Sequence, residues 1–348
     1  MVAFQISQFV LLLLLSGDVE YSRCERFNIV PSPDSPCPGE FTGEPCITLQ
    51  LYVANPSLSS NITLEVHPGN HSLDSELSVS NIDYFTMRVN TLSPPATVTC
   101  DQQVSDWRFH FNRLQQIHIG GITFVGCEMR MDYITNATFE RNSMVNQTRR
   151  GDVFYITYSS VQITQCIFSD NKVYEGIIYS RGCTIIIEQS SIRNDDYSPG
   201  CCDHRRAMLI IGGNVDIRNS NFSTNVAVLY DNGVGGVIYA SGAVLTITKS
   251  FFRDSRAETN GGAIYFDGGN ITIIYYHQQH SQWWRGRGYI YSARHYTNIS
   301  MINSFFNQNI AAYCGVMAVT ELYHYNVNIT GNTFTYNRAM QHISFWKQ

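Results

Sequence analysis

Two pairs of ionisable side chains are spaced closely enough to do chemistry. Asp195 and Asp196 are adjacent carboxylates, and paired carboxylates act as general acid and base in glycoside hydrolysis. They stand in a turn-like segment, which favours a solvated turn. His277 and His280 would share one face of a helix and could bind a metal there. The chain around them favours strands and lacks the glutamate of the zinc-protease motif, so a polar loop is the preferred interpretation. The sequence predicts no catalytic residue, no metal site and no cofactor.

The most distinctive surface-type phrase follows these histidines. It contains Trp283, Trp284, Arg285 and Arg287. Tryptophan and arginine dominate binding hot spots, because a flat ring and a guanidinium group both stack and form hydrogen bonds. We predict that these four residues contact a ligand, either a glycan or a protein. In the alternative interpretation, the two tryptophans pack their own loop onto the rest of the fold.

The cysteines indicate an oxidising compartment. There are ten, an even number that suits disulfide bonds. Cys100 and Cys127 are about one repeat apart, and a bond between them fits that spacing. Cys166 occupies a small inward position, where it could equally be a buried thiol. The adjacent Cys201 and Cys202 are expected to bond to separate partners rather than to each other.

The N-terminus predicts export from the cell. Residues 9–15 are a run of phenylalanine, valine and leucine, followed by Ser16 and Gly17. Spanning a bilayer takes about 20 apolar residues, so we interpret residues 1–19 as a cleaved signal peptide. No later segment is long enough to span a membrane. Eight Asn-x-Ser/Thr sequons agree with an extracellular glycoprotein, and their acceptors are Asn61, Asn70, Asn136, Asn146, Asn221, Asn270, Asn298 and Asn328.

The composition excludes several classes of protein. The formal net charge is −5 and only 15% of residues are charged, whereas nucleic-acid binding needs a basic face. The 21 tyrosines and 19 phenylalanines favour strands and argue against disorder. We therefore expect a β-rich extracellular protein without a nucleic-acid partner.

A nine-residue phrase, Ile-x-x-small-x-Phe-x-x-Asn, recurs along the chain. Clear copies begin at Ile134, Ile163, Ile217, Met301 and Ile329. In these and weaker copies, the sixth position holds Phe139, Phe168, Phe222, Phe252, Phe306 and Phe334. The ninth position holds Asn142, Asn171, Asn225, Asn309 and Asn337. Such self-similarity is typical of repeat architectures.

A second phrase, Gly-x-Ile-Tyr, falls between copies of the first, as in residues 176–179. Short runs such as Val161/Ile163 precede each nine-residue phrase, and their period of two indicates strands. Each unit therefore contains about three short strands, which form one rung of a coil. Rungs stacked about 4.8 Å apart pair every strand in parallel with its neighbours. The sequence predicts an all-β fold, a right-handed parallel β-helix of about 9–11 rungs.

The repeated positions then have physical roles. We expect the phenylalanines to stack inside the coil as an aromatic row. We expect the asparagines to occupy turns with a left-handed φ and to bond to one another between rungs as a ladder. In the alternative interpretation, they are surface polar residues between ordinary strands.

Two motifs resemble those of a known family. Phe168-Ser169-Asp170-Asn171 and Gly261-Gly262-Ala263-Ile264 resemble the Phe-x-x-Asn and Gly-Gly-Ala-Ile repeats of the chlamydial polymorphic outer-membrane proteins, within the pectin-lyase-like superfamily. This resemblance covers about residues 115–340. The segment from Pro45 to His71 is similar to uncharacterised secreted invertebrate β-helix proteins. The resemblance implies the fold and secretion, and it implies no particular chemistry.

We predict three segments and one leading function. They are the signal peptide over residues 1–19, a Cys- and Pro-rich cap with a short helix over 20–60, and the β-helix over 61–348. Without a convincing acid–base cluster, the leading hypothesis is a secreted or cell-surface, non-enzymatic recognition or adhesion module. Its ligand is an unidentified glycan or extracellular protein. The alternative is a polysaccharide lyase or hydrolase of the pectin-lyase-like superfamily.

Overall fold

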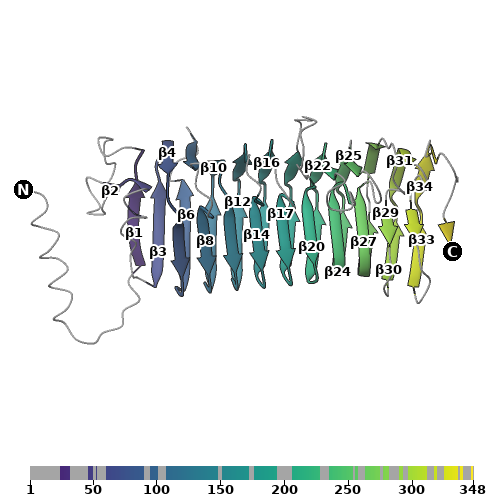
Figure 1. Ribbon diagram of the computed structural model, residues 1–348, viewed down its shortest axis with the longest axis horizontal. Coiled ribbons are helices and arrows are strands. Elements are labelled where there is room, and N and C mark those ends of the chain that lie inside the picture. Colours follow the sequence, from purple (N-terminus) through teal and green to yellow (C-terminus); the bar gives the residue numbers. More distant parts are fainter. Residues whose placement is uncertain are drawn as a thin grey trace, which may run out of the picture.

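The protein is an elongated coil of stacked strands (Figure 1). The computed structural model describes residues 24–31, 46–49, 52, 60–89, 95–100, 107–147, 151–171, 176–193, 206–227, 235–253, 255–257, 263–274, 277–281, 290–292, 297–311, 317–319, 325–335, 338–339 and 346–347. Its strands pair in parallel from one rung to the next, as β3 does with β6 and β12 with β15. The predicted parallel β-helix is confirmed.

Each rung contributes one strand to each of three columns. Column 1 contains β1 (Cys24–Ile29), β3 (Asn61–Val66), β6 (Tyr84–Val89), β9 (Gln116–Gly120), β12 (Asn136–Glu140), β15 (Ser160–Thr164), β18 (Thr184–Glu188), β21 (Asn214–Arg218), β30 (Thr297–Ile302) and β33 (Tyr325–Thr330). Column 2 contains β4 (Gly69–Leu73), β7 (Ala96–Cys100), β10 (Ile122–Val125), β13 (Ser143–Val145), β16 (Ile167–Ser169), β19 (Ser191–Arg193), β22 (Asn221–Ser223), β25 (Phe251–Arg253), β28 (His277–Ser281), β31 (Phe305–Ala311) and β34 (Thr333–Thr335). Column 3 contains β5 (Leu77–Ser80), β8 (Phe109–Asn112), β11 (Met129–Asp132), β14 (Phe154–Thr157), β17 (Ile178–Arg181), β20 (Met208–Ile211), β29 (Ile290–Ser292), β32 (Met317–Val319) and β36 (Trp346–Lys347).

A few strands depart from this scheme. Two long strands, β24 (Ile238–Thr248) and β27 (Ile264–Ile274), run through column 3 and then column 1. Short strands lie beside the columns, with β2 (Cys46–Ile47) on β1, β23 (Val226–Ala227) on β26 (Arg256–Ala257), and β35 (Arg338–Ala339) on β31.

The alternation of apolar and polar residues decides which side of each strand faces the interior. In β14, Phe154 and Ile156 are buried in the core, whereas Tyr155 between them is partly exposed. Side chains two residues apart share a face of a strand, so every strand has one inner and one outer row. One continuous hydrophobic core fills the coil from Ile29 to Met301. The outer rows are therefore the surfaces available for binding.

The predicted aromatic row forms in column 2, with one member misplaced. Successive rungs align Phe124, Met144, Phe168, Ile192, Phe222, Phe252, Gln278, Phe306 and Phe334. The ring centroids of Phe222 and Phe252 are 4.8 Å apart. Phe139 instead lies in column 1, in register with Ile119 and Ile163. Any apolar residue of suitable size fits an inner row. The copy of the phrase that begins at Ile134 therefore places its phenylalanine on a column 1 strand, one strand away from the column 2 position of the other copies.

The predicted role of the asparagines is wrong in its chemistry. The left-handed φ belongs to the preceding residue, 54° at Arg141, 57° at Asp170 and 53° at Thr224. Asn171 is buried, and its Nδ2 donates to the carbonyl of Met144 at 2.9 Å. Its Oδ1 accepts from the backbone N–H of Gln147 at 3.0 Å. The strand ladder leaves corner groups unpaired, and a buried amide must satisfy them. A bond from amide to backbone therefore replaces the expected ladder of amides.

The other asparagines divide between two places. Asn225 is buried and donates to the carbonyl of Ser223 at 3.1 Å. Asn142 belongs to a different corner, where its Nδ2 donates to the carbonyl of Ile119 at 2.8 Å. Asn309 lies on β31, and Asn337 lies outside the described residues.

The cysteine predictions are resolved at two sites. Cys100 and Cys127 form a disulfide between adjacent rungs, with their Cα atoms 5.2 Å apart. Cys166 is a buried free thiol at the corner that Ser190 and Ser220 occupy in later rungs. Burial raises the pKa of the Cys166 thiol to about 11, so it stays protonated and unreactive at neutral pH. Cys201 and Cys202 lie outside the described residues.

The coil begins earlier than predicted. Strand β1 lies within the expected cap, yet it pairs with β3 from Cys24 to Ile29. Phe27 packs on the core beside the buried Ile29, and this alternation makes the segment a strand. Near the expected short helix, the N–H of Tyr52 donates to the carbonyl of Thr48 at 3.0 Å. Residues 1–19 lie outside the described part of the chain, and in the described part no helix is long and apolar enough to cross a membrane.

Candidate functional site

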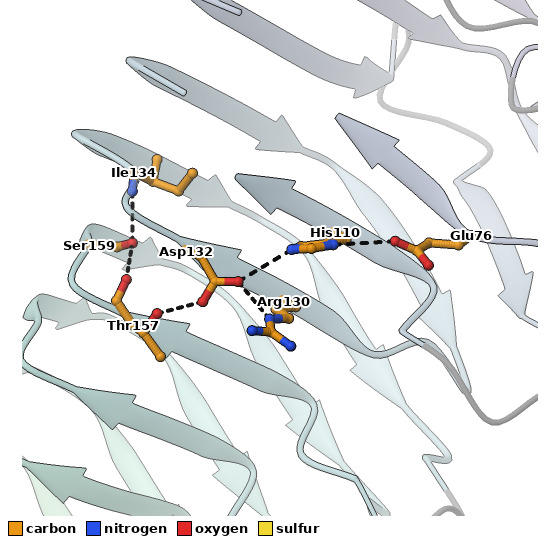
Figure 2. Close-up of polar contacts among 7 residues, drawn as sticks. All are labelled: Glu76, His110, Arg130, Asp132, Ile134, Thr157 and Ser159. Carbon is orange, nitrogen blue, oxygen red and sulfur yellow. Dashed lines mark hydrogen bonds and ion pairs between the residues drawn. The ribbon is translucent and has the colours of Figure 1, made fainter. Parts of the chain in front are cut away.

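A network of polar side chains lies on the outer face of column 3 (Figure 2). At its centre is Asp132, the last residue of β11. Its carboxylate accepts hydrogen bonds from Arg130 Nε at 2.6 Å, from His110 Nε2 at 3.3 Å and from Thr157 Oγ1 at 2.5 Å. Only 10% of the Asp132 side chain is exposed, and these three donors compensate for burying its charge. Asp132 is therefore placed to hold its neighbours in position.

His110 links two carboxylates in this network. Its Nδ1 is 3.3 Å from Glu76 Oε1, and its Nε2 is 3.3 Å from Asp132 Oδ2. A doubly protonated imidazole can donate to both, whereas a neutral one can donate to only one. The side chains of His110 and Glu76 are partly exposed, so both can meet a ligand. A histidine oriented by a carboxylate is also an arrangement suited to general acid–base work.

A buried serine fixes the network to the corner of the coil. Ser159 Oγ donates to the carbonyl of Thr157 at 2.8 Å and accepts from the backbone N–H of Ile134 at 2.9 Å. Figure 2 shows these bonds continuing from Thr157 to the next rung. Because the serine satisfies backbone groups of two rungs, the side chains above it stand on a rigid base.

Tyrosine rings stack beside the network on the same outer row. Tyr155 follows Arg130 in register, and Tyr179 follows Tyr155. The centroids of Tyr155 and Tyr179 are 4.5 Å apart, with an angle of 1° between the rings. The guanidinium carbon of Arg130 lies 5.4 Å from the Tyr155 centroid, and the Trp107 ring lies 5.3 Å from it. Arg130 therefore joins the polar network to a stacked aromatic surface.

A second tyrosine pair stands on the ridge between columns 3 and 1. Tyr133 directly follows Asp132, and Tyr158 directly follows Thr157. Their ring centroids are 5.4 Å apart at an angle of 15°. The residues are 55% and 51% exposed. Two large rings thus remain open to solvent next to the polar network.

The backbone of this exposed pair is strained. Tyr133 and Tyr158 have φ angles of 58° and 49°, a left-handed conformation that costs an ordinary residue about 1–2 kcal/mol. The same ridge position holds glycine in the next rungs, Gly182 and Gly212, where the conformation is free of this cost. A Cβ atom at Gly182 would meet the Tyr158 ring at 3.0 Å, so that ring lies against bare backbone. Asn81 and Arg113 take the same conformation at this position in the two preceding rungs, so the left-handed φ belongs to the turn of the coil.

The structure does not place the residues predicted to bind a ligand. Trp283, Trp284, Arg285 and Arg287 lie outside the described residues, as do Asp195 and Asp196. His277 and His280 fall on β28, so the helical spacing that would join them on one face does not arise. All eight sequon asparagines lie in the described part, and none of them is buried.

Sequence reasoning missed His110, Asp132 and the ridge tyrosines. Their contacts join residues 22 and 25 positions apart, which is one rung of the coil. One signal was available, because Asp132-Tyr133 and Thr157-Tyr158 place a tyrosine after a polar residue at the same point of two successive rungs. The two repeat phrases do not extend to that position, so they did not identify these tyrosines as candidates.

The arrangement offers groups for hydrogen bonding beside aromatic rings. In the described residues, no three metal-binding side chains gather into a group. Asp132 is enclosed by donors, whereas the partly exposed side chains of Arg130, His110 and Glu76 present polar atoms near the tyrosines. Flat rings beside hydrogen-bonding groups suit a ligand with both apolar and hydroxyl-rich faces.

Comparison with known proteins gives only distant resemblances. No protein-family model and no curated protein matches this chain. The catalytic domain of a GH87 α-1,3-glucanase, solved in complex with nigerose, is 12% identical over 82% of this chain and 63% of that chain, with a TM-score of 0.48. A rhamnogalacturonan lyase is 11% identical over 88% of this chain and 87% of that chain, with a TM-score of 0.47. The chain spans less than two thirds of the glucanase domain, and both activities belong to those proteins.

Proposed function

We propose that this protein is an extracellular, non-enzymatic recognition module that binds a glycan on the outer face of column 3. The observation that carries the proposal is the exposed stack of Tyr133 and Tyr158 beside the Asp132 network. Exposed aromatic pairs on a soluble protein are placed at a cost unless a ligand covers them. A rigid sheet is the right support, because it keeps the rings apart by a fixed rung spacing.

The chemistry around the rings favours a sugar. A tyrosine face accepts the apolar C–H side of a sugar ring, and neighbouring polar groups bond to its hydroxyls. Arg130 presents the remaining N–H groups of its guanidinium, and Glu76 presents carboxylate oxygen. A stable protein interface buries about 800 Å² per partner, and two tyrosine rings supply only part of that area. The site therefore supports a glycan better than a protein partner.

The surroundings of the two carboxylates support binding without hydrolysis. A glycosidase needs two carboxyl groups on either side of the scissile bond. Here Asp132 already accepts three hydrogen bonds and is nearly enclosed. Glu76 is separated from it by the ring of His110. The His110 ring therefore occupies the line between the two acids.

The proposal is tested by binding to a glycan array, followed by titration calorimetry with the best glycan. The double variant Tyr133→Gly/Tyr158→Gly should raise Kd at least about tenfold and should barely change stability, because glycine adopts the left-handed conformation freely. The matched control is Tyr84→Ala, which removes a similarly exposed tyrosine from column 1. Absence of any saturable glycan, or equal losses in the control, would overturn the proposal.

The second candidate function is a polysaccharide lyase or hydrolase. It is favoured by His110, whose orientation by Asp132 is that of a general base held by a carboxylate. Incubation with uronic-acid polysaccharides, with and without calcium, distinguishes it. Release of unsaturated or reducing ends that disappears in His110→Ala would establish an enzyme in place of a binding module.

A further inference from the structure

The sequon asparagines are distributed unevenly over the coil. Five of the eight, Asn61, Asn136, Asn270, Asn298 and Asn328, lie on strands of column 1. Asn70 and Asn221 lie on column 2, and Asn146 directly follows a strand of that column. Column 3, which carries the tyrosines, holds no sequon on its strands.

Four of the column 1 asparagines share a single outer row. The register runs from Asn61 through Tyr84 and Gln116 to Asn136. It continues over Ser160, Thr184, Asn214 and Val244 to Asn270 and Asn298. Asn328 lies on the same face, opposite Ser300. Sequons far apart in the chain therefore converge on one line along the molecule.

The geometry of a sequon in a strand makes these acceptors accessible. The asparagine and the Ser/Thr of a sequon are two residues apart, so both point outward when the middle residue points inward. The middle residues Ile62, Ala137, Ile271 and Ile299 are all buried. Asn136, Asn270, Asn298 and Asn328 are exposed, and Asn61 is partly exposed. The residues that would carry a sugar are therefore exposed at Asn136, Asn270, Asn298 and Asn328.

We propose that column 1 is the glycosylated face of this protein, and that column 3 stays free of N-linked sugar. The modification is transfer of an oligosaccharide from a polyisoprenyl diphosphate donor. Asparagine Nδ2 forms a bond to C1 of the first sugar, the bond from C1 to the diphosphate breaks, and the amide loses one proton. The proposal rests on the extracellular location proposed above, but not on the binding of a glycan ligand.

The strand pairing also fixes when the transfer occurs. The backbone of β27, which carries Asn270, pairs with β24 on one side and with β30 on the other. An enzyme that grips an extended acceptor needs those same backbone groups. Asn270 and Asn298 are moreover one rung apart, with Asn298 Nδ2 donating to Asn270 Oδ1 at 2.7 Å. Transfer at this pair therefore precedes the stacking of the rungs.

A sugar row on column 1 would direct ligands to the bare face. Carbohydrate chains are bulky and hydrated, so they obstruct partners over the face that carries them. The strands of column 3 carry no sequon, so no sugar would be attached on the strand beside Tyr155 or Asp132. The row would thus leave column 3, which adjoins column 1 at the ridge, as the column without N-linked sugar on its strands.

The first test reads occupancy directly. The full chain is produced in a eukaryotic secretory cell line and treated with a peptide-N-glycosidase in ¹⁸O water, which converts each occupied asparagine to labelled aspartate. Peptide mass spectrometry should find label at Asn136, Asn270, Asn298 and Asn328. Label restricted to Asn70, Asn146 and Asn221, or no label at all, would overturn the proposal. Occupancy is measured by mass, so failure of glycan binding leaves this result unaffected.

The second test compares matched new sequons on the two faces. Gln162→Asn creates an Asn-Ile-Thr sequon on column 1, and Tyr155→Asn creates the same tripeptide on column 3. The first variant should be glycosylated and secreted normally. The second should be retained in the cell, because its sugar would displace Trp107 and Arg130 from the face of that column. Tyr155→Gln, which lacks the sequon, should still be secreted. Normal secretion of a glycosylated Tyr155→Asn variant would show that column 3 need not be bare.

Discussion

Single buried polar side chains hold the corners of this coil. Asn171 bonds to the backbone of Met144 and Gln147 one rung away, and Ser190 Oγ accepts the N–H of Cys166 in the same manner. A satisfied bond of this kind contributes about 1 kcal/mol, and an orphaned buried partner costs about 1–3 kcal/mol. The corner residues therefore act through the backbone groups that they satisfy. Asp132 follows the same rule on the outer face, where its donors are side chains.

Two histidines near the N-terminal end predict how stability depends on pH. His71 is buried and its Nε2 donates to the carbonyl of His67 at 2.8 Å. Desolvation by burial lowers the pKa of His71 and also that of His67, the latter against the opposing charge of Glu65. The unfolded chain therefore binds more protons than the folded one at mildly acidic pH. Stability is retained above the ordinary histidine value of about 6.5 and lost as the pH falls below it.

The measurement is the melting temperature between about pH 7.5 and pH 5.5. It should fall as the pH is lowered, and it should fall less in His71→Val, which places the residue type of the neighbouring Val98 at this register. An identical decline in the variant would assign the effect to other groups.

The turns between strands are built from single left-handed residues. Glycine takes this conformation freely, whereas Tyr133, Tyr158 and Asn219 adopt it at some cost. Such a turn bends the chain from one column to the next within one residue. It also exposes the side chain of the turn residue, which is why Tyr133 and Tyr158 stand open to solvent. The two tyrosines are therefore exposed because they occupy the turns that join the strands.

Two adjacent glycines separate conformational strain from lack of space. Gly212 has φ +66° with nothing within 4 Å of an added Cβ, whereas a Cβ at Gly213, with φ +80°, would be 2.1 Å from the carbonyl oxygen of Cys183. Gly212→Ala should lower the free energy of unfolding by about 1 kcal/mol. Gly213→Ala should lower the free energy of unfolding by more than about 2 kcal/mol, because the backbone of the preceding rung at Cys183 must move. Urea denaturation measures both, and equal losses would contradict this distinction.

At the scale of the molecule, each rung packs only on its neighbours. The core is continuous from end to end, yet every strand of the columns pairs with the rungs directly before and after it. Stability of such a coil is a sum over rungs and the interfaces between them. Whole rungs can therefore be added or removed, whereas the position of each strand within its rung must be kept.

Removal of one whole rung tests this property. Ser160 is in register with Thr184, so deleting residues 160–183 joins equivalent points of two rungs. The shortened protein should fold with a lower melting temperature and the circular dichroism of a β protein. Deleting residues 160–171 removes only β15 and β16, which leaves columns 1 and 2 interrupted, and that variant should fail to fold. A whole-rung deletion that unfolds as completely as the partial one would contradict independent rungs.

The sequence alone determined the coil. Val161/Ile163 and the other alternating pairs require one face of each strand to be buried, and the recurring phrase requires successive rungs to bury the same positions. Cys100 and Cys127 were identified as partners because one rung of spacing brings them together. These properties depend on local pattern and on repeat length, both of which are written along the chain.

Only the tertiary structure decided which column each repeat position occupies and which outward side chains contact one another. Phe139 matches the phrase but lies in column 1, because an inner row accepts many apolar residues and so gives similar residues no unique place. Glu76, His110 and Asp132 come from three successive rungs, and no local pattern marks which outward side chains will meet. These contacts depend on the register between strands. The buried side chains fix that register, and it in turn decides which exposed side chains lie next to each other.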